Sequence, residues 1–334
     1  MNGPWSARTL WPAAKLAGGV GILVALVVEL GSDTVLDALA SIGIGSVLAA
    51  LGLGLLTIVA GAARWCVVAR GVGLPLPLPV AVSNCYRAGF LNSVLPAGVL
   101  GDVHRAVGYG REIGDVARGV RVVALERVTG QAAVVLLGLA VVLGAQPTLL
   151  VTAVDSLRPG WLGTAELVAA LVVVAALGLW LVRGSLRDRV SAALHAGRAD
   201  ARSGVFARGA WPTLLLLSMV ALAGYLALFV IAARAAGSTA PLGELLPLLV
   251  LGLLAMALPL NVGGWGPREG VTAVAFGAVG LGAAQGLATA VVYGVLSLIS
   301  CLPGAVILLL SATRAGGPRR TPALVPAVLE RSAS

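Results

Sequence analysis

Two short motifs in the chain match each other, and each interrupts a long apolar segment. They occupy residues 96–105 and 259–268. In both, a glycine follows the first proline by five positions and an arginine follows it by nine. Proline and clustered glycine disfavour a continuous helix. Broken apolar segments at matching positions in two halves of a chain predict an internal duplication, with a binding site at the paired breaks.

Apolar residues dominate the remainder of the chain. Its 334 residues are 59% hydrophobic and 11% charged, whereas an ordinary soluble domain is roughly 45–50% apolar and about 25% charged. The composition predicts an all-α polytopic membrane protein. The apolar runs and their short connections leave no stretch of about 100 residues for a soluble catalytic domain. We therefore expect any activity to lie in the bilayer or at its surface.

The net charge of +9 comes almost entirely from arginine. In a membrane protein, such residues mark cytoplasmic segments rather than nucleic-acid binding. Segments 183–208 and 313–334 are rich in arginine, whereas 31–45, 145–164 and 236–243 carry at most one basic residue each. This distribution predicts that both termini and segment 183–208 lie in the cytoplasm, with the protein in the cytoplasmic membrane.

With the basic segments inside, the apolar runs predict six spans and two re-entrant helical hairpins. The spans are expected at 11–30, 46–69, 119–144, 165–182, 211–235 and 283–311. The hairpins are expected at 75–117 and 241–282, because a full span at 75–117 would place a basic stretch outside, against the charge rule.

Three crossings separate the two breaks, and an odd number of crossings inverts the second copy. The chain is therefore expected to contain an inverted repeat, with halves at about 46–144 and 211–311. Both halves would belong to one transmembrane domain at 1–312, followed by a basic cytoplasmic tail at 313–334.

The breaks carry the charges that suit an anionic ligand. Unwound backbone at membrane depth must be buried in protein or line an aqueous cavity, and half-helix ends offer free N–H groups to an anion such as a phosphodiester. Arg105 and Arg268 add full positive charges, and a guanidinium binds phosphate through two parallel hydrogen bonds. Asp102 and Glu269 have two possible roles, which are to neutralise these arginines or to bind the ammonium of a headgroup.

Several groups of residues give the chain a resemblance to a known family. They are Tyr86, Arg87, 92–98, Gly101, Asp102, Arg105, 125–127 and 259–269. Over roughly residues 10–312 the chain resembles the transmembrane region of lysylphosphatidylglycerol synthases, a broad group of flippase-like membrane proteins. The resemblance implies lipid movement across the bilayer. Aminoacyl transfer in that family belongs to a separate soluble domain, so we expect this chain not to be an enzyme.

The physical argument and the resemblance together give a set of candidate substrate-binding residues. They are Arg87, Asn92, Gly98, Gly101, Asp102, Arg105, Glu126, Arg127, Asn261, Gly263, Gly264, Arg268 and Glu269. Structural roles are the alternative. These are ion pairs with neighbouring acids for the two break arginines, close helix packing for the glycines, and a local pair for Glu126 with Arg127. Arg64, near the inner end of span 46–69, is expected to extend to the membrane interface.

We expect a flippase-like transporter that moves a phospholipid or lipid-linked headgroup. ATP is not the expected energy source, because the only lysine, Lys15, is not in a phosphate-binding loop. Expected partners are anionic or zwitterionic phospholipids and a separately encoded lipid-modifying enzyme, with no nucleic acid, metal or cofactor. Two alternatives stay open. One is a membrane-embedded transferase acting on a lipid-linked substrate, and the other is a non-transporting scaffold for an envelope-lipid enzyme.

Overall fold

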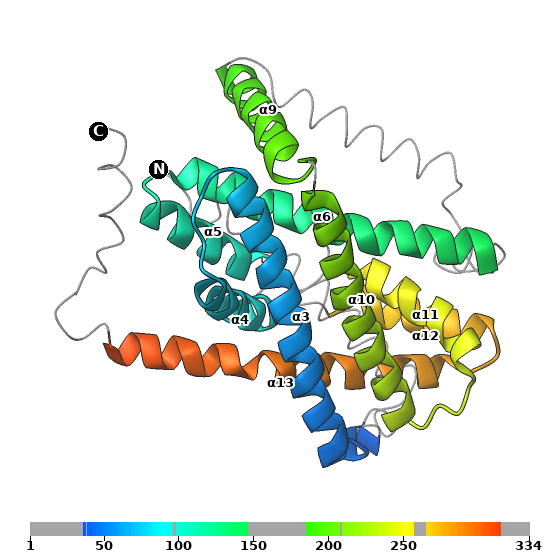
Figure 1. Ribbon diagram of the computed structural model, residues 1–334. Helices are drawn as coiled ribbons and strands as arrows, with labels where there is room; N and C mark the ends of the chain where they lie inside the picture. Colours follow the sequence, from blue (N-terminus) through cyan, green and yellow to red (C-terminus); the bar gives the residue numbers. More distant parts are fainter. Residues whose placement is uncertain are drawn as a thin grey trace, which may run out of the picture.

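The computed structural model describes residues 36–37, 39–95, 98–145, 185–207, 209–256 and 265–314. The predicted spans 11–30 and 165–182 lie outside these residues. Nine α-helices are found in the described part of the chain (Figure 1). The protein is an all-α membrane protein, as its composition predicts.

Eight of these helices form two sets of four, in the same order of lengths. The first set is α3 (Ile44–Gly71), α4 (Leu78–Val94), α5 (Leu100–Glu112) and α6 (Val116–Ala145). The second set is α10 (Ala210–Ala235), α11 (Leu242–Ala255), α12 (Pro267–Ala278) and α13 (Ala283–Arg314). Each set has a long helix, two short helices and a second long helix. We call the two sets the first half and the second half.

The turns that follow the first helix of each half are also alike. Gly73 and Gly237 have positive φ angles of 80° and 88°, a left-handed conformation that glycine adopts without steric cost and that commonly ends a helix. Pro77 and Pro241 then precede the first residues of α4 and α11. The same turn chemistry therefore occurs twice in the chain.

Both breaks fall where the proline and glycine clusters predict them. In the first half, α4 ends at Val94 and α5 begins at Leu100. In the second half, α11 ends at Ala255 and α12 begins at Pro267. The two short helices pack against each other in each half, which makes each block a helical hairpin.

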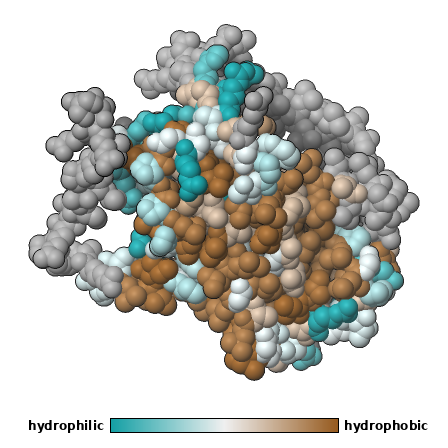
Figure 2. Space-filling model, in the orientation of Figure 1, coloured by the Kyte–Doolittle hydropathy of each residue, from teal (hydrophilic) through white to brown (hydrophobic). Residues whose placement is uncertain are grey.

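Three helices, α3, α10 and α13, are long and apolar enough to cross a membrane. They coincide with the predicted spans 46–69, 211–235 and 283–311, and the predicted span 119–144 lies within α6. Large apolar side chains on these helices are exposed, among them Leu48, Leu55, Leu216 and Leu309. Figure 2 shows a broad apolar surface across the middle of the molecule. A surface of this kind is suited to contact with lipid chains.

The two halves pack against each other through their long helices. Helix α3 lies beside α10 and runs in the opposite direction (Figure 1). Helix α13 contacts α3, α4 and α10, while α6 contacts α3, α10 and α11. The short helices α4 and α5 lie on one side of this central group, and α11 and α12 lie on the other (Figure 1). The volume enclosed between the halves is where the candidate site lies.

The basic segment 183–208 contains a helix that the charge pattern did not predict. This helix, α9 (Ser185–Gly204), contacts α3 and α6. Asp200 on α9 accepts a hydrogen bond from Arg121 Nε on α6 at 2.7 Å. The ends of α3 and α9 approach closely, because a Cβ atom at Gly71 would lie 2.6 Å from Gly204 Cα.

Candidate functional site

A cavity of about 350 Å³ lies between the two halves. All four helices of the first half line it, together with α10, α11 and α13 of the second half. The first half contributes the charged side chains, which are Arg64, Asp102, Arg105, Glu126 and Arg127. The second half contributes uncharged side chains, including Tyr225, Tyr293, Ser297 and Ser300. Among the described residues, the cavity therefore has a charged wall and an uncharged wall that mixes hydroxyl and apolar side chains.

Glu126 on α6 is the centre of the charged wall. Its Oε1 accepts a hydrogen bond from Arg64 Nε at 2.9 Å, and its Oε2 accepts one from Arg105 Nη2 at 2.5 Å. Arg64 also donates to Ser218 Oγ on α10 at 3.2 Å. Glu126 therefore joins α3, α5 and α6, and Arg64 extends this network to the second half.

Asp102 near the start of α5 is a second acidic centre. Its Oδ1 accepts from Arg105 Nε at 2.9 Å, and its Oδ2 accepts from Asn92 Nδ2 at 2.8 Å and from Arg127. Asn92 Oδ1 in turn accepts from the backbone N–H of Gly101 at 2.7 Å. One amide side chain on α4 thus binds both the start of α5 and its acidic residue.

Arg105 and Arg127 differ in their exposure and in how many hydrogen bonds they already make within the protein. The Arg105 side chain is 5% exposed. It binds both acids, contacts Cys85 Sγ at 3.3 Å and lies 4.9 Å from the ring centroid of Trp65. The Arg127 side chain is 53% exposed, and among the described residues it forms an ion pair with Asp102 alone. Arg127 is therefore the cavity arginine with the most donor capacity left for a ligand.

Arg268 and Glu269 form a separate, deeply buried pair at the start of α12. Glu269 accepts from Arg268 Nε at 3.0 Å and from the backbone N–H of Gly266 at 2.7 Å. The guanidinium also lies 5.0 Å and 5.1 Å from the ring centroids of Trp265 and Tyr293. Tyr293 lines the cavity and the pair does not, so Arg268 and Glu269 lie behind the cavity wall.

The matched motifs do not place the two break arginines at equivalent positions. Arg105 is the sixth residue of α5, whereas Arg268 is the second residue of α12. The acids are placed alike, since Asp102 and Glu269 are each the third residue of their helix. Helix α5 begins four residues after Pro96, whereas α12 begins eight residues after Pro259. As a result, the two arginines lie about one helical turn apart in register.

The candidate glycines have different roles. A Cβ atom at Gly101 would lie 2.1 Å from the backbone oxygen of Ala88, so this glycine permits close packing of α5 on α4. Gly98 lines the cavity and has a φ of 59°. The three remaining candidates of the second break, Asn261, Gly263 and Gly264, lie outside the described residues.

The remaining candidates separate into two groups. Asn92, Glu126 and Arg127 line the cavity, whereas Arg87 is not among the residues that line it. Glu126 is paired with Arg64 and Arg105, whereas the alternative in the sequence was a local pair with Arg127.

Arg64 is the charged residue among the described cavity-lining residues that the sequence analysis missed, and Gln131 is an uncharged one. Arg64 was expected at the membrane interface, yet its side chain is only 12% exposed and binds Glu126. Its position as a single charge within an apolar run was the available signal, because a charge inside a membrane span is functional by default. Gly130 on α6 leaves room for it, since a Cβ atom there would lie 2.6 Å from Arg64 Nη2.

Comparison with known proteins places the chain in a family. No curated protein matches it in sequence. A family model described as the lysylphosphatidylglycerol synthase TM region matches residues 13–304. This range includes every residue that lines the cavity. The match relates the protein to lipid handling in membranes. The chain therefore belongs to the family of the lysylphosphatidylglycerol synthase transmembrane region.

Proposed function

We propose that the protein is a flippase-like transporter that moves a phospholipid across the cytoplasmic membrane without ATP. The headgroup would occupy the cavity between the two halves while the acyl chains stay against the apolar exterior. The observation that carries this proposal is the half-exposed side chain of Arg127 within a cavity lined by both halves. A charged headgroup cannot cross hydrocarbon unaided, because each unpaired charge there is costly.

The size and chemistry of the cavity support a headgroup ligand. Its volume of about 350 Å³ lies within the roughly 300–1,000 Å³ of typical ligand pockets. Arg127 can bind a phosphate oxygen through its planar guanidinium. The neutral side chains Asn92 and Gln131 lie on the same wall and can bind glycerol or phosphate oxygens.

We also propose that the two halves form an inverted repeat, related by a two-fold axis in the membrane plane. The equal order of helix lengths and the paired turns at Gly73 and Gly237 support this relationship. So does the opposite direction of α3 and α10 (Figure 1). Each hairpin also packs on a long helix of the other half, α4 on α13 and α11 on α6. Such repeats exchange conformations to open a central site to each side in turn.

Reconstitution tests the transport proposal. The purified protein is placed in liposomes that contain phosphatidylglycerol labelled on one acyl chain with a nitrobenzoxadiazole fluorophore, and dithionite is added outside. Empty liposomes should lose only the fluorescence of the outer leaflet, whereas liposomes with protein should lose that of both. Arg127→Gln should slow the inner-leaflet loss by about tenfold, the value of one charge-assisted hydrogen bond.

Arg121→Gln is the matched control, because Arg121 is also on α6 and pairs with Asp200 away from the cavity. It should transport at the unchanged rate. Transport no faster than in empty liposomes would overturn the proposal. If a lipid-modifying enzyme copurifies with such an inactive protein, the scaffold alternative is favoured, whereas chemical conversion of the labelled lipid would favour the transferase.

A further inference from the structure

We infer that the cavity selects a lipid headgroup with net negative charge and disfavours a cationic, aminoacylated headgroup of the kind that the family description names. This inference rests on the proposed function, because it assumes that the headgroup enters the cavity between the halves. It concerns the net charge of the headgroup. It is argued from the acidic side chains of the cavity, which are already paired with arginines.

Both acids among the described residues that line the cavity are already bound to arginine. Each oxygen of Glu126 accepts from a different guanidinium, and each oxygen of Asp102 does the same. The ammonium of a lysyl headgroup would have to displace one of these arginines and would then lie beside the others. Like charges that lie this close repel each other, and the repulsion is stronger beside buried groups than in bulk water.

Positive charge is in excess on the charged wall. Among the described lining residues, the three arginines outnumber the two carboxylates by one. The exposed member of the group is Arg127, so the arginine that a ligand can reach belongs to a group with net positive charge. Residues 96–97 and 257–264, which lie outside the described residues, include no charged residue in the sequence.

The wall contributed by the second half offers little to a cation. Glu269 is fully buried and bound to Arg268, so it cannot receive an ammonium from the cavity. The ring of Tyr293 is stacked on Phe229, with centroids 4.2 Å apart, and is also covered by Arg268. Tyr225 is then the one other aromatic residue among the described lining residues. Recognition of ammonium groups by aromatic rings generally uses a cage of several free faces.

A binding competition tests the inference independently of transport. Native mass spectrometry of the purified protein in a neutral detergent would compare phosphatidylglycerol with lysylphosphatidylglycerol at equal concentrations. We expect phosphatidylglycerol to bind at least about tenfold more tightly, since the two headgroups differ by two charges next to an accessible arginine. Arg127→Gln should reduce this preference, and Arg127→Glu should reverse it.

Arg111→Gln and Arg111→Glu are the matched controls. Arg111 is exposed at the end of α5 and does not line the cavity, so these variants change the net charge equally and should leave the preference unaltered. The neutral variant Arg127→Gln keeps the test valid if Arg127→Glu does not fold.

Binding and transport are read separately. Equal binding of the two lipids, or tighter binding of lysylphosphatidylglycerol, would overturn the inference even if the liposome assay shows transport. A tenfold preference for phosphatidylglycerol that depends on Arg127 would support it even if no transport is found, and the proposed function alone would then fail.

Discussion

Arg105 on α5 donates to Glu126 on α6 at 2.5 Å, and both side chains are almost fully buried. The same carboxylate also binds Arg64 on α3. Two arginines inside the protein, Arg64 and Arg105, therefore share the negative charge of Glu126. A buried ion pair of this kind contributes little net stability compared with an apolar replacement, but removal of one partner leaves an uncompensated buried charge.

This arrangement predicts a large loss of stability in Glu126→Gln. The amide keeps the shape of the side chain but leaves Arg64 and Arg105 without their shared counter-charge. The free energy of unfolding should fall by about 3–5 kcal/mol. Thermal unfolding in detergent, followed by tryptophan fluorescence, measures the change. The matched control is Asp200→Asn, which breaks the more exposed pair with Arg121 and should cost about 0–1 kcal/mol. Equal losses in the two variants would contradict the central role of Glu126.

Two glycines on α5 give a second pair of contrasting variants. Gly101→Ala would place a methyl group 2.1 Å from the backbone oxygen of Ala88, so α5 would have to move away from α4. It should cost at least about 1–3 kcal/mol, as overpacking does. Gly108 has open space at its Cβ position, and Gly108→Ala should stabilise the helix by up to about 1 kcal/mol. The same thermal unfolding assay applies. A destabilised Gly108→Ala variant would show that α5 packs differently on this side.

The helix boundaries near the breaks could be predicted from the sequence because they follow from local chemistry. Pro96 with Gly98 and Pro259 with its following glycines cannot continue a helix, and the helices end close to these positions. The spans now seen as α3, α10 and α13 were equally predictable, since length and hydropathy are properties of one segment. Segment 183–208 shows the limit of this reasoning. Its basic residues predicted that it lies on the cytoplasmic side of the membrane, but they did not predict that it forms a helix.

The partners of the charged side chains could not be predicted in this way. Glu126 binds Arg64, which is 62 residues away, and Arg127 binds Asp102, which is 25 residues away. Such contacts depend on how α3, α5 and α6 rotate against one another, and a hydropathy pattern does not fix that rotation. The motif spacing was also misleading for Arg268, since α12 begins later in its motif than α5 does.

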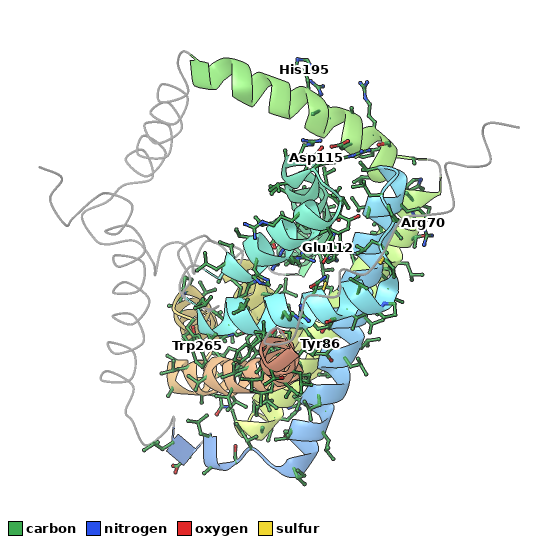
Figure 3. All side chains as sticks on the ribbon, turned by 90° about the vertical axis from the view of Figure 1, so that its left-hand side faces the viewer. Arg70, Tyr86, Glu112, Asp115, His195 and Trp265 are labelled. Carbon is green, nitrogen blue, oxygen red and sulfur yellow. The ribbon has the colours of Figure 1, made fainter. Side chains whose placement is uncertain are left out.

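The charge distribution predicts which end of the molecule faces the cytoplasm. Arg70, Glu112, Asp115 and His195 lie toward the end that carries α9, whereas Tyr86 and Trp265 lie farther from it (Figure 3). Basic segments mark the cytoplasmic side, so residues on α9 should be cytoplasmic and the loop before α11 should be external.

Cysteine labelling checks this orientation on a background in which Cys66, Cys85 and Cys301 are replaced by alanine. An impermeant maleimide should label Leu242→Cys in intact cells, because this position is 51% exposed at the start of α11. Ser203→Cys, on an exposed position of α9, should react only after the cells are permeabilised. The reverse pattern would invert the proposed topology.

The buried pair of Arg268 and Glu269 at the start of α12 predicts that changing one partner destabilises the protein more than changing both. Arg268→Met removes the cation and leaves Glu269, which is fully buried, without its counter-charge. This single variant should lose about 3–5 kcal/mol of stability.

Adding Glu269→Gln removes the unpaired charge, and the amide oxygen can still accept from the backbone N–H of Gly266. The double variant should therefore regain most of the loss, and its cost should be clearly smaller than the sum of the two single costs. Because the pair lies behind the cavity wall, the double variant should also keep its preference for phosphatidylglycerol in the binding competition. Recovered stability with a lost preference would show instead that Arg268 reaches the ligand.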